Sequence, residues 1–300
     1  MILIVGATGV LGRQTAEKLL AAGERVRAAT REPERARSLA RLGAEVIHAD
    51  LIDPLSLARA CEGVDAVLAA AHSLLGSGRY ASSAVDGTGH RALIDAARTS
   101  RVKRFVYTSA RGAAPNHPVD FFRTKAGVER YLQESGIDFT ILRPSAFMEW
   151  HVHRLLGQGI VDTGKATVFG AGKTPTNFIA GNDVAQFAYL ALTRPEMGGR
   201  TLELGGPDNV TKRDIVAMYE RHAGRSAKVK YVPLAVMRLL SPIVRPIKPV
   251  LSRLMDMSVH GETTDQTFDV RELPQDAAVQ LTRVHDFILA RTRRPDASAA

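Results

Sequence analysis

Short apolar runs and amphipathic stretches alternate along the first two thirds of the chain. Met1 to Val5 is apolar, and a glycine-rich turn separates it from an amphipathic run over Arg13 to Ala22 that ends at Gly23. A period of two predicts strands, and apolar positions three and four residues apart predict helices. The pattern predicts further strands over 25–29, 45–48, 64–71, 103–107, 138–142 and 201–204, and further helices over 33–42, from 54, over 85–99 and over 123–134.

Strands that alternate with helices predict an α/β fold with a doubly wound parallel sheet, the Rossmann type. Right-handed crossovers then place the first strand near the centre of the sheet. We assign residues 1–146 and 177–204 to this Rossmann core. Residues 147–176 and 205–292 are less regular and are predicted to form a smaller C-terminal lobe that binds substrate. Residues 293–300 are Arg, Pro, Asp, Ser and Ala only, and we expect a disordered tail.

The composition narrows the class of protein. The chain has 300 residues and is 45% hydrophobic, which is enough for one large domain with an appendage. It contains no apolar run long enough to span a membrane. Because the chain opens on a core strand, we expect no signal peptide. Cys61 is the single cysteine, which excludes an internal disulfide and fits a reducing compartment. We therefore predict a cytoplasmic protein in which Cys61 is buried and inert.

Three glycines follow the first strand at a spacing of three: Gly6, Gly9 and Gly12. In a dinucleotide fingerprint the first glycine allows a tight turn, the second lets the pyrophosphate approach the backbone, and the third lets the helix pack closely. The amides and the positive end of the helix dipole then bind the phosphates. The predicted cofactor-binding residues of this turn are Gly6, Thr8, Gly9, Val10, Leu11 and Gly12.

The end of the second strand indicates which dinucleotide is bound. An NAD site has Asp or Glu there, whereas an Arg accommodates the 2′-phosphate of NADP. This chain has Thr30 and Arg31, and its first carboxylate comes at Glu32. We predict that Arg31 binds the 2′-phosphate and that NADPH is preferred over NADH. Arg13 and Arg35 are possible helpers; a solvated surface role for Arg31 is the alternative.

Three further segments carry a family resemblance. Phe105-Val106-Tyr107-Thr108-Ser109, Phe121-Phe122-Arg123-Thr124-Lys125 and Ile141-Leu142-Arg143-Pro144-Ser145, taken with Gly6 to Gly12, resemble the NmrA-like group of atypical short-chain dehydrogenase/reductases. The resemblance covers residues 1 to 195 at motif level. It implies that Ser109 orients a substrate carbonyl and that Lys125 binds the nicotinamide ribose. It also places Pro144, Ser145 and Phe147 beside the nicotinamide.

Residues at the ends of two other strands complete the expected cofactor site. The resemblance implies that Asp50 and Leu51 border the adenine; a helix-capping role for this acid is the alternative. Ala70 and Ala71 are small, which leaves room for a ligand at the carboxyl edge of the sheet. His72 follows them and is predicted to border the cofactor.

The position of the usual catalytic tyrosine is occupied by Phe121. In orthodox relatives a Tyr four residues before the Lys donates the proton, and the Lys lowers the pKa of that Tyr. Phenylalanine has no exchangeable proton. Two functions remain open: an NADPH-dependent oxidoreductase with Lys125 and Ser109 as catalytic residues, and an NADP(H)-binding redox sensor without turnover. An epimerase or dehydratase is disfavoured, because such members also depend on the tyrosine.

A reductase of this kind would transfer hydride to a small or mid-sized apolar carbonyl or quinone acceptor, since a stabilised anion needs less help from an acid. Phe121, Phe147, Met148 and Trp150 are the predicted substrate contacts. Tyr107 is interpreted as a core residue, and Tyr80, in a Gly/Ser-rich loop, is close enough in sequence to the strand edge to reach a ligand. Glu149 and His153 have a helical spacing that could share a metal, but a third ligand is lacking, so no metal site is expected.

The formal net charge of +9 is concentrated in one segment: residues 221–255 contain eight Lys or Arg and no acid. No nucleic-acid-binding motif accompanies them, and we expect no nucleic-acid partner. Residues 233–255 combine apolar and basic positions with four prolines. One interpretation is a helical cover of the substrate cleft with snorkelling basic side chains; the other is peripheral contact with a membrane surface.

Overall fold

The computed structural model describes residues 1–292, so the predicted disordered tail at 293–300 lies outside the described residues. Contacts divide the chain into two compact units. The larger consists of Met1–Pro144, Gly181–Leu204 and Pro274–Val279. The smaller consists of Ser145–Ala180, Gly205–Leu273 and the described residues from Gln280. These divisions fall within a few residues of the segment ends inferred from sequence, with 274–279 as an additional piece of the larger unit.

The larger unit is built on a seven-stranded, fully parallel sheet in the order β10-β6-β5-β4-β1-β2-β3. β1 lies inside the sheet between β4 and β2, as right-handed crossovers require. The doubly wound α/β fold predicted from the sequence is therefore confirmed. The strands are β1 (Ile2–Val5), β2 (Val26–Thr30), β3 (Glu45–His48), β4 (Ala66–Ala69), β5 (Arg104–Thr108), β6 (Asp138–Pro144) and β10 (Arg200–Leu204).

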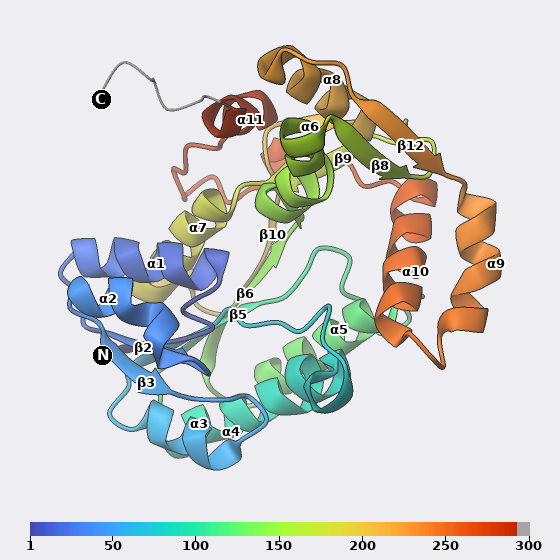
Figure 1. Ribbon diagram of the computed structural model, residues 1–300. Coiled ribbons are helices and arrows are strands. Elements are labelled where there is room, and N and C mark those ends of the chain that lie inside the picture. The colour runs from blue at the N-terminus through green and yellow to red at the C-terminus, as the bar shows by residue number, and fades with distance from the viewer. Residues whose placement is uncertain (293–300) are drawn as a thin grey trace. The chain divides into compact units, whose positions relative to one another are not determined.

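Helices cover both faces of this sheet (Figure 1). α1 packs against α7 on one face, and α3 packs against α4 and α4 against α5 on the other. β1 and β4 are consequently buried along their whole length, which explains their continuous apolar sequence. The helices are α1 (Val10–Ala21), α2 (Arg37–Arg41), α3 (Pro54–Cys61), α4 (His90–Thr99), α5 (Asp120–Gln133) and α7 (Gly181–Thr193).

The core of the larger unit lies between the sheet and the face made by α3, α4 and α5. Leu57, Leu93, Phe105 and Leu132 are fully buried there, and each such side chain contributes about 1.5–3 kcal/mol on burial. Cys61 belongs to the same core, and burial raises the pKa of its thiol to about 12. The predicted burial of Cys61 is confirmed, and its inertness stays a prediction.

The segment predicted as one helix over 85–99 is divided. Residues Ser83–Gly89 form a π-helical turn, η3, and α4 follows from His90. A Cβ at Gly89 would lie 2.7 Å from the carbonyl oxygen of Leu51, so only glycine permits this approach. Wide turns of this kind redirect side chains and are frequent at functional sites.

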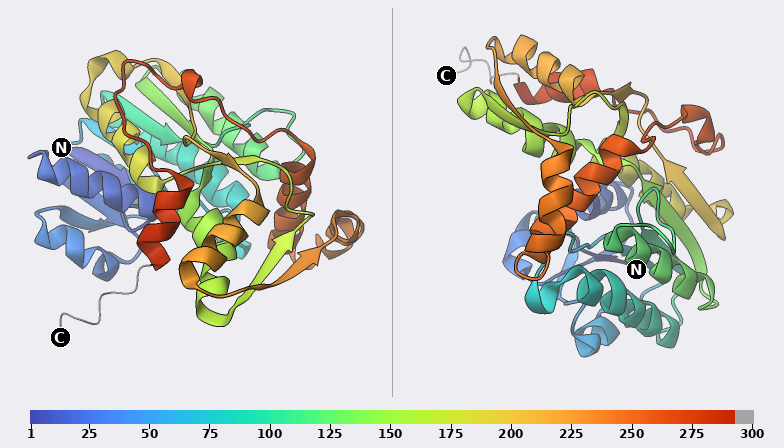
Figure 2. Two further views of the ribbon diagram at one scale, coloured as in Figure 1. Left: turned by 90° about the horizontal axis from the view of Figure 1, so that it is seen from above. Right: turned by 90° about the vertical axis from the view of Figure 1, so that its right-hand side faces the viewer.

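The smaller unit has its own core, formed around the three-stranded sheet β11-β9-β7 and the parallel pair β12-β8. Its strands are β7 (Ala146–Phe147), β8 (Lys165–Phe169), β9 (Thr176–Ile179), β11 (Asn209–Val210) and β12 (Lys228–Val232). Its helices are the π-helix η4 (Glu149–Gly157), α6 (Gln158–Thr163), α8 (Lys212–Ala223), α9 (Leu234–Val244), α10 (Pro249–Thr263) and α11 (Val284–Thr292). Figure 2 shows α9 and α10 side by side in both views.

None of the helices in residues 1–292 combines the length and the apolar character that crossing a bilayer requires.

Candidate active site

The glycine turn joins β1 to α1, and packing rather than a ligand explains two of its glycines. Gly6 has φ +88°, and a Cβ there would lie 2.7 Å from the amide nitrogen of Ala71. A Cβ at Gly12 would lie 2.3 Å from the carbonyl oxygen of Gly6. Gly9 is exposed, and its Cβ would meet only that same oxygen, at 3.3 Å. Gly9 therefore has open space around it, at the position expected for the pyrophosphate.

The start of α1 presents backbone donors. The first hydrogen bond at this end runs from the Arg13 amide to the Gly9 carbonyl, at 3.0 Å. The amides of Val10, Leu11 and Gly12 have no acceptor within residues 1–292. They stand at the positive end of the helix dipole, so this turn is suited to an anion such as a phosphate.

Arg31, at the end of β2, lies over the ring of Tyr80, with 4.7 Å between its guanidinium carbon and the ring centroid. The Tyr80 hydroxyl in turn donates to Oδ2 of Asp50, at 3.0 Å. Tyr80 thus joins Arg31 to Asp50, two predicted cofactor residues that lie 19 positions apart in the sequence. Asp50 also accepts from the Ile52 amide, at 3.2 Å.

Leu51, unlike Asp50 before it, packs in the hydrophobic core. It is buried among the core residues of the larger unit. Its carbonyl oxygen is the atom that approaches Gly89. The predicted contact of Leu51 with adenine therefore remains a prediction, whereas its packing role is plain.

The two other arginines suggested as helpers are engaged elsewhere. Arg13 pairs with Glu17 at 3.2 Å, and Arg35 pairs with Glu32 at 3.3 Å. Arg31 is exposed and has no carboxylate partner in the described part of the chain. Of the three, Arg31 has the guanidinium that is available to a phosphate.

Lys125, on α5, is buried, and its position is fixed by three groups. Its Nζ donates to the carbonyl of Thr108 at 2.9 Å and lies 3.9 Å from Oδ1 of Asp86. The ammonium also faces the Tyr107 ring, 4.9 Å from its centroid. Burial lowers the pKa of Lys125, and the charges of Asp86 and Glu129 oppose that shift.

Asp86 was not singled out from the sequence. It is fully buried on η3, accepts from the Ser82 hydroxyl at 2.6 Å, and accepts from the Ser73 amide at 3.1 Å. The available signal was an acid at the end of a Gly/Ser-rich loop that leads into an amphipathic helix. Since Lys125 is 39 residues further along the chain, that signal did not identify its partner.

Four buried polar atoms around Lys125 lack hydrogen-bond partners among residues 1–292. Two of them lie on β5, one on the residue after it and one on α4. They are Tyr107 Oη, Thr108 Oγ1, Ser109 Oγ and His90 Nε2. Leaving one such group unsatisfied costs about 1–3 kcal/mol. Their number in one region indicates a place where water or a ligand supplies the missing partners.

His90 is the least expected member of this group. Its Nδ1 is 2.9 Å from the Val85 carbonyl, and its ring packs edge-on against Tyr107, with 5.3 Å between centroids. Burial, together with the charge of Lys125, lowers the pKa of His90 to about 4. His90 is therefore neutral at physiological pH, donates through Nδ1, and presents Nε2 as an acceptor. Tyr107 is fully buried, which confirms its interpretation as a core residue.

Phe121 lies one helical turn before Lys125, and its ring centroid is 5.6 Å from the ammonium. Phe121 is buried and packs edge-on against Phe122, with 5.5 Å between centroids. No hydroxyl can therefore come from this position. Near the end of β4, Ala71 lies against Gly6, and His72 is exposed.

The residues predicted to line the nicotinamide and substrate are divided between the units. Pro144 ends β6 in the larger unit, and its carbonyl accepts from the Arg111 amide at 3.0 Å. Ser145 is in the smaller unit and donates to Oδ1 of Asn177 at 2.9 Å. Phe147 and Trp150 are half-buried, but Met148 is fully buried in the core of the smaller unit. Met148 is a packing residue here, because η4 begins there and turns the side chain inward.

Glu149, His151 and His153 lie on η4, and each has a local role. Glu149 lies 4.0 Å from Arg291, and Nδ1 of His153 lies 3.0 Å from the Tyr219 hydroxyl. Burial lowers the pKa of His151 to about 4. Within residues 1–292 no group of three His, Cys, Asp or Glu side chains is arranged to hold a metal ion.

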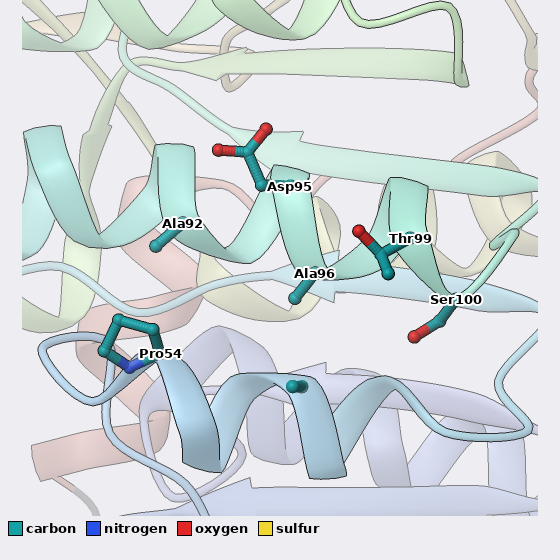
Figure 3. A pocket seen from close by; sticks show the side chains of 7 residues that line it. Pro54, Ala92, Asp95, Ala96, Thr99 and Ser100 are labelled. Carbon is teal, nitrogen blue, oxygen red and sulfur yellow. The ribbon is translucent and has the colours of Figure 1, made fainter.

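A surface depression lies between α3 and α4 and is lined by Pro54, Ala58, Ala92, Asp95, Ala96, Thr99 and Ser100 (Figure 3). Its one ionisable side chain, Asp95, accepts from the Tyr131 hydroxyl at 2.8 Å. The lining consists of three alanines, a proline, two hydroxyl residues and this one acid, and it brings together no catalytic groups. The glycine turn and the Lys125 cluster are therefore the better candidate for a functional site.

Comparison with known proteins gives consistent matches. The sequence profile of the NmrA-like family matches residues 1–287. A photosystem II assembly factor, Ycf39, of Trieres chinensis is 29% identical, over 96% of this chain and 91% of the relative. An NAD(P)H azoreductase of Xenophilus azovorans is 31% identical, over 79% of this chain and 78% of the relative. The crystal structure of an NADPH-dependent quinone oxidoreductase from Escherichia coli, complexed with NADPH, has a TM-score of 0.77 at 24% identity, covering 98% and 100% of the two chains.

Proposed function

Because the chain belongs to the NmrA-like family, we propose that it is an NADPH-dependent oxidoreductase that reduces a small or mid-sized apolar carbonyl or quinone. The observation that carries this proposal is the buried ammonium of Lys125, held by Asp86 and Thr108 beside polar atoms that lack partners. A structural lysine would gain little from such burial, since desolvating a charge is costly. A lysine that donates a proton to a substrate does benefit, because burial fixes the position of its ammonium.

The glycine turn fits a dinucleotide. Gly9 leaves open space, and the amides of Val10, Leu11 and Gly12 lie at the positive end of the dipole of α1. These groups would hold the pyrophosphate, and Arg31 would hold the 2′-phosphate with its guanidinium. Lys125 and the unpartnered hydroxyl of Ser109 would hold the nicotinamide ribose and the acceptor carbonyl. NADPH, when bound, supplies the hydride.

The proton must come from a group other than residue 121. We infer that Lys125 is this general acid: its Nζ is positioned by the Thr108 carbonyl, and the charge of Asp86 helps to keep it protonated. Reduction of a carbonyl places a negative charge on oxygen, and an ammonium in a buried site stabilises that charge strongly. Phe121 makes the neighbouring wall apolar, which suits an apolar acceptor.

The second candidate is a protein that binds NADP(H) without turnover and reports redox state to a protein partner. The assembly-factor name of the Trieres chinensis relative favours it, as does the missing tyrosine. In this function the buried Lys125–Asp86 pair would order η3 around the bound cofactor rather than deliver a proton.

One experiment separates the two candidates. NADPH binding is titrated by fluorescence, and NADPH oxidation is followed with a panel of quinones, enones and aldehydes in the same preparation. Oxidation that depends on the acceptor supports the reductase. Tight binding without oxidation by any acceptor supports the sensor, and absence of binding would contradict both.

Arg31→Ala is expected to reduce the preference for NADPH over NADH. A charge-assisted bond to phosphate contributes roughly 1.5–3 kcal/mol, so the Kd for NADPH should rise about tenfold or more while that for NADH stays constant. Arg35→Ala is the matched control, because Arg35 is already paired with Glu32. An unchanged ratio of the two Kd values in Arg31→Ala would show that Arg31 does not bind the 2′-phosphate.

Asp86→Asn is expected to alter the pH profile. The charge of Asp86 raises the pKa of Lys125 against burial. Without that charge the pKa of Lys125 falls, so the ammonium loses its proton at a lower pH. The alkaline limb of the activity profile should therefore shift to lower pH. The other titratable groups near Lys125 are His72, His90, Tyr107 and Glu129. The measurement is kcat/KM against pH, with Asp95→Asn as the control; an unmoved alkaline limb would argue against Lys125 as the acid.

A further inference from the structure

The smaller unit carries a helical hairpin, residues 234–263, made of α9, α10 and the turn that joins them. Its two helices pack together, and Ser241 and Ser252 hydrogen-bond across the contact at 2.9 Å. Arg245, beside the turn, bonds Oδ2 of Asp256 at 3.0 Å. Prolines 246 and 249 flank the turn and separate the two helices. The hairpin is therefore an ordered element, held by contacts between its own two helices.

The apolar stripe of α9 faces solvent. Val236, Leu239, Leu240 and Ile243 follow the spacing i, i+3, i+4 and i+7, which is one face of a helix, and Ile247 lies in the turn that follows. Leu239, Ile243 and Ile247 are 69%, 61% and 79% exposed. Met237 and Ser241, on another face, are buried, and Ser241 lies against Ser252 of α10. An aliphatic stripe in this position has no partner in residues 1–292, and a contiguous apolar patch of this kind marks an interaction surface.

On α9 and the turn the charged side chains are all cationic, and on α10 the carboxylate of Asp256 is paired with Arg245. No Asp or Glu occurs from residue 221 to 255, whereas Arg238, Arg245 and Lys248 are exposed on the hairpin. A second copy of the chain docked symmetrically would place these cations against themselves. The exposed apolar side chains are all aliphatic, and aromatic anchors, which dominate protein interfaces, are missing from residues 233–264. The aliphatic stripe and the exposed cations therefore suit a partner that is both apolar and anionic and that binds without directional contacts.

We propose that this hairpin binds the surface of an anionic phospholipid bilayer. Ile243, Ile247 and Leu251, which lie near the turn and are exposed, enter the apolar edge of the bilayer. Arg238 and Lys248, which are exposed, bind headgroup phosphates, as basic residues do at anionic membranes. The site is independent of the glycine turn and would hold whether or not the chain turns over NADPH.

Flotation of the full-length protein with vesicles tests the proposal. Vesicles of phosphatidylcholine alone are compared with vesicles that contain phosphatidylglycerol, at low and high salt. The protein should float with the anionic vesicles at low salt, float much less at high salt, and stay unbound with neutral vesicles. Equal flotation with neutral vesicles, or none with anionic vesicles at low salt, would overturn the proposal.

A pair of variants identifies the surface. Ile247→Ser with Lys248→Glu should reduce binding to anionic vesicles roughly tenfold or more, because it removes an inserted side chain and reverses a charge. Leu55→Ser with Arg59→Glu makes the same chemical changes on α3, where both residues are also exposed, and should bind as the wild type does. Melting temperatures confirm folding of both. Unchanged flotation of the first pair overturns the assignment, as does self-association of the wild type that this pair abolishes without any vesicle binding.

Discussion

Replacing Lys125 by Met should lower kcat at saturating NADPH by about 10²–10⁴-fold, the usual contribution of a general acid. The change removes the one buried ammonium near the end of β5 and leaves Thr108 without its donor. It also leaves Asp86 buried without its counter-charge, and breaking such a pair costs roughly 3–5 kcal/mol of stability. The single variant could therefore lose activity through misfolding.

The double variant Lys125→Met with Asp86→Asn separates the two causes. It removes both charges, so the free energy of unfolding should recover toward the wild-type value, whereas kcat should stay low. Stopped-flow oxidation of NADPH and chemical denaturation measure the two quantities. A double variant that is stable and retains wild-type kcat would show that Lys125 is not the acid, and that the proton comes from water or another group.

Gly12→Ala should abolish tight NADPH binding, with Kd raised by about 100-fold or more. The added Cβ would lie 2.3 Å from the Gly6 carbonyl oxygen and 3.0 Å from the Cα of Ala7. Both are backbone atoms, so the turn itself has to move. Overpacking of this kind costs roughly 1–3 kcal/mol, and the amides that would hold the phosphates move with the turn.

Gly9→Ala distinguishes binding from folding. Its Cβ would meet only the Gly6 carbonyl oxygen, at 3.3 Å, so stability should stay near the wild-type value while NADPH affinity falls. Gly261→Ala, in α10 where the Cβ meets no atom, is the neutral control. Isothermal titration and thermal melts give both quantities. If Gly12→Ala bound NADPH with unchanged affinity, the glycine turn would not be the phosphate site.

Part of the candidate site could be predicted because its residues are close in sequence. Gly6 to Gly12 belong to one strand, turn and helix, and Arg31 is the residue after the next strand. Local hydrophobic periodicity was sufficient to place them at one edge of the sheet. The absence of a proton donor at Phe121 is likewise a property of the sequence alone.

Other parts depended on the path of a loop. Asp86 meets Lys125, and Tyr80 joins Arg31 to Asp50, through the loop after β4 and the π-helical turn η3 that follows it. Sequence patterns report which face of an element is apolar, not which loop folds back onto it. The pairing of buried charges, and the unpartnered atoms of His90, Tyr107 and Ser109, therefore emerge only when the chain is folded.

In the smaller unit, too, the sequence predicted one part of the structure and tertiary packing decided another. Four prolines within residues 233–255 argue against one long helix, and two helices are observed, although Pro242 itself lies within α9. The apolar spacing of α9 was equally compatible with a covered face, but tertiary packing buries Met237 and Ser241 and leaves Leu239 and Ile243 in solvent.

The sequence by itself determined the parallel α/β fold, the family and the loss of the usual tyrosine. These depend on local periodicity, on a turn that requires glycine and on single residue identities. The tertiary structure alone decided which charges are buried together, that Met148 is a packing residue and that an aliphatic helix face meets solvent. Each of these results from contacts between segments far apart in the chain, whose free energy no local pattern encodes.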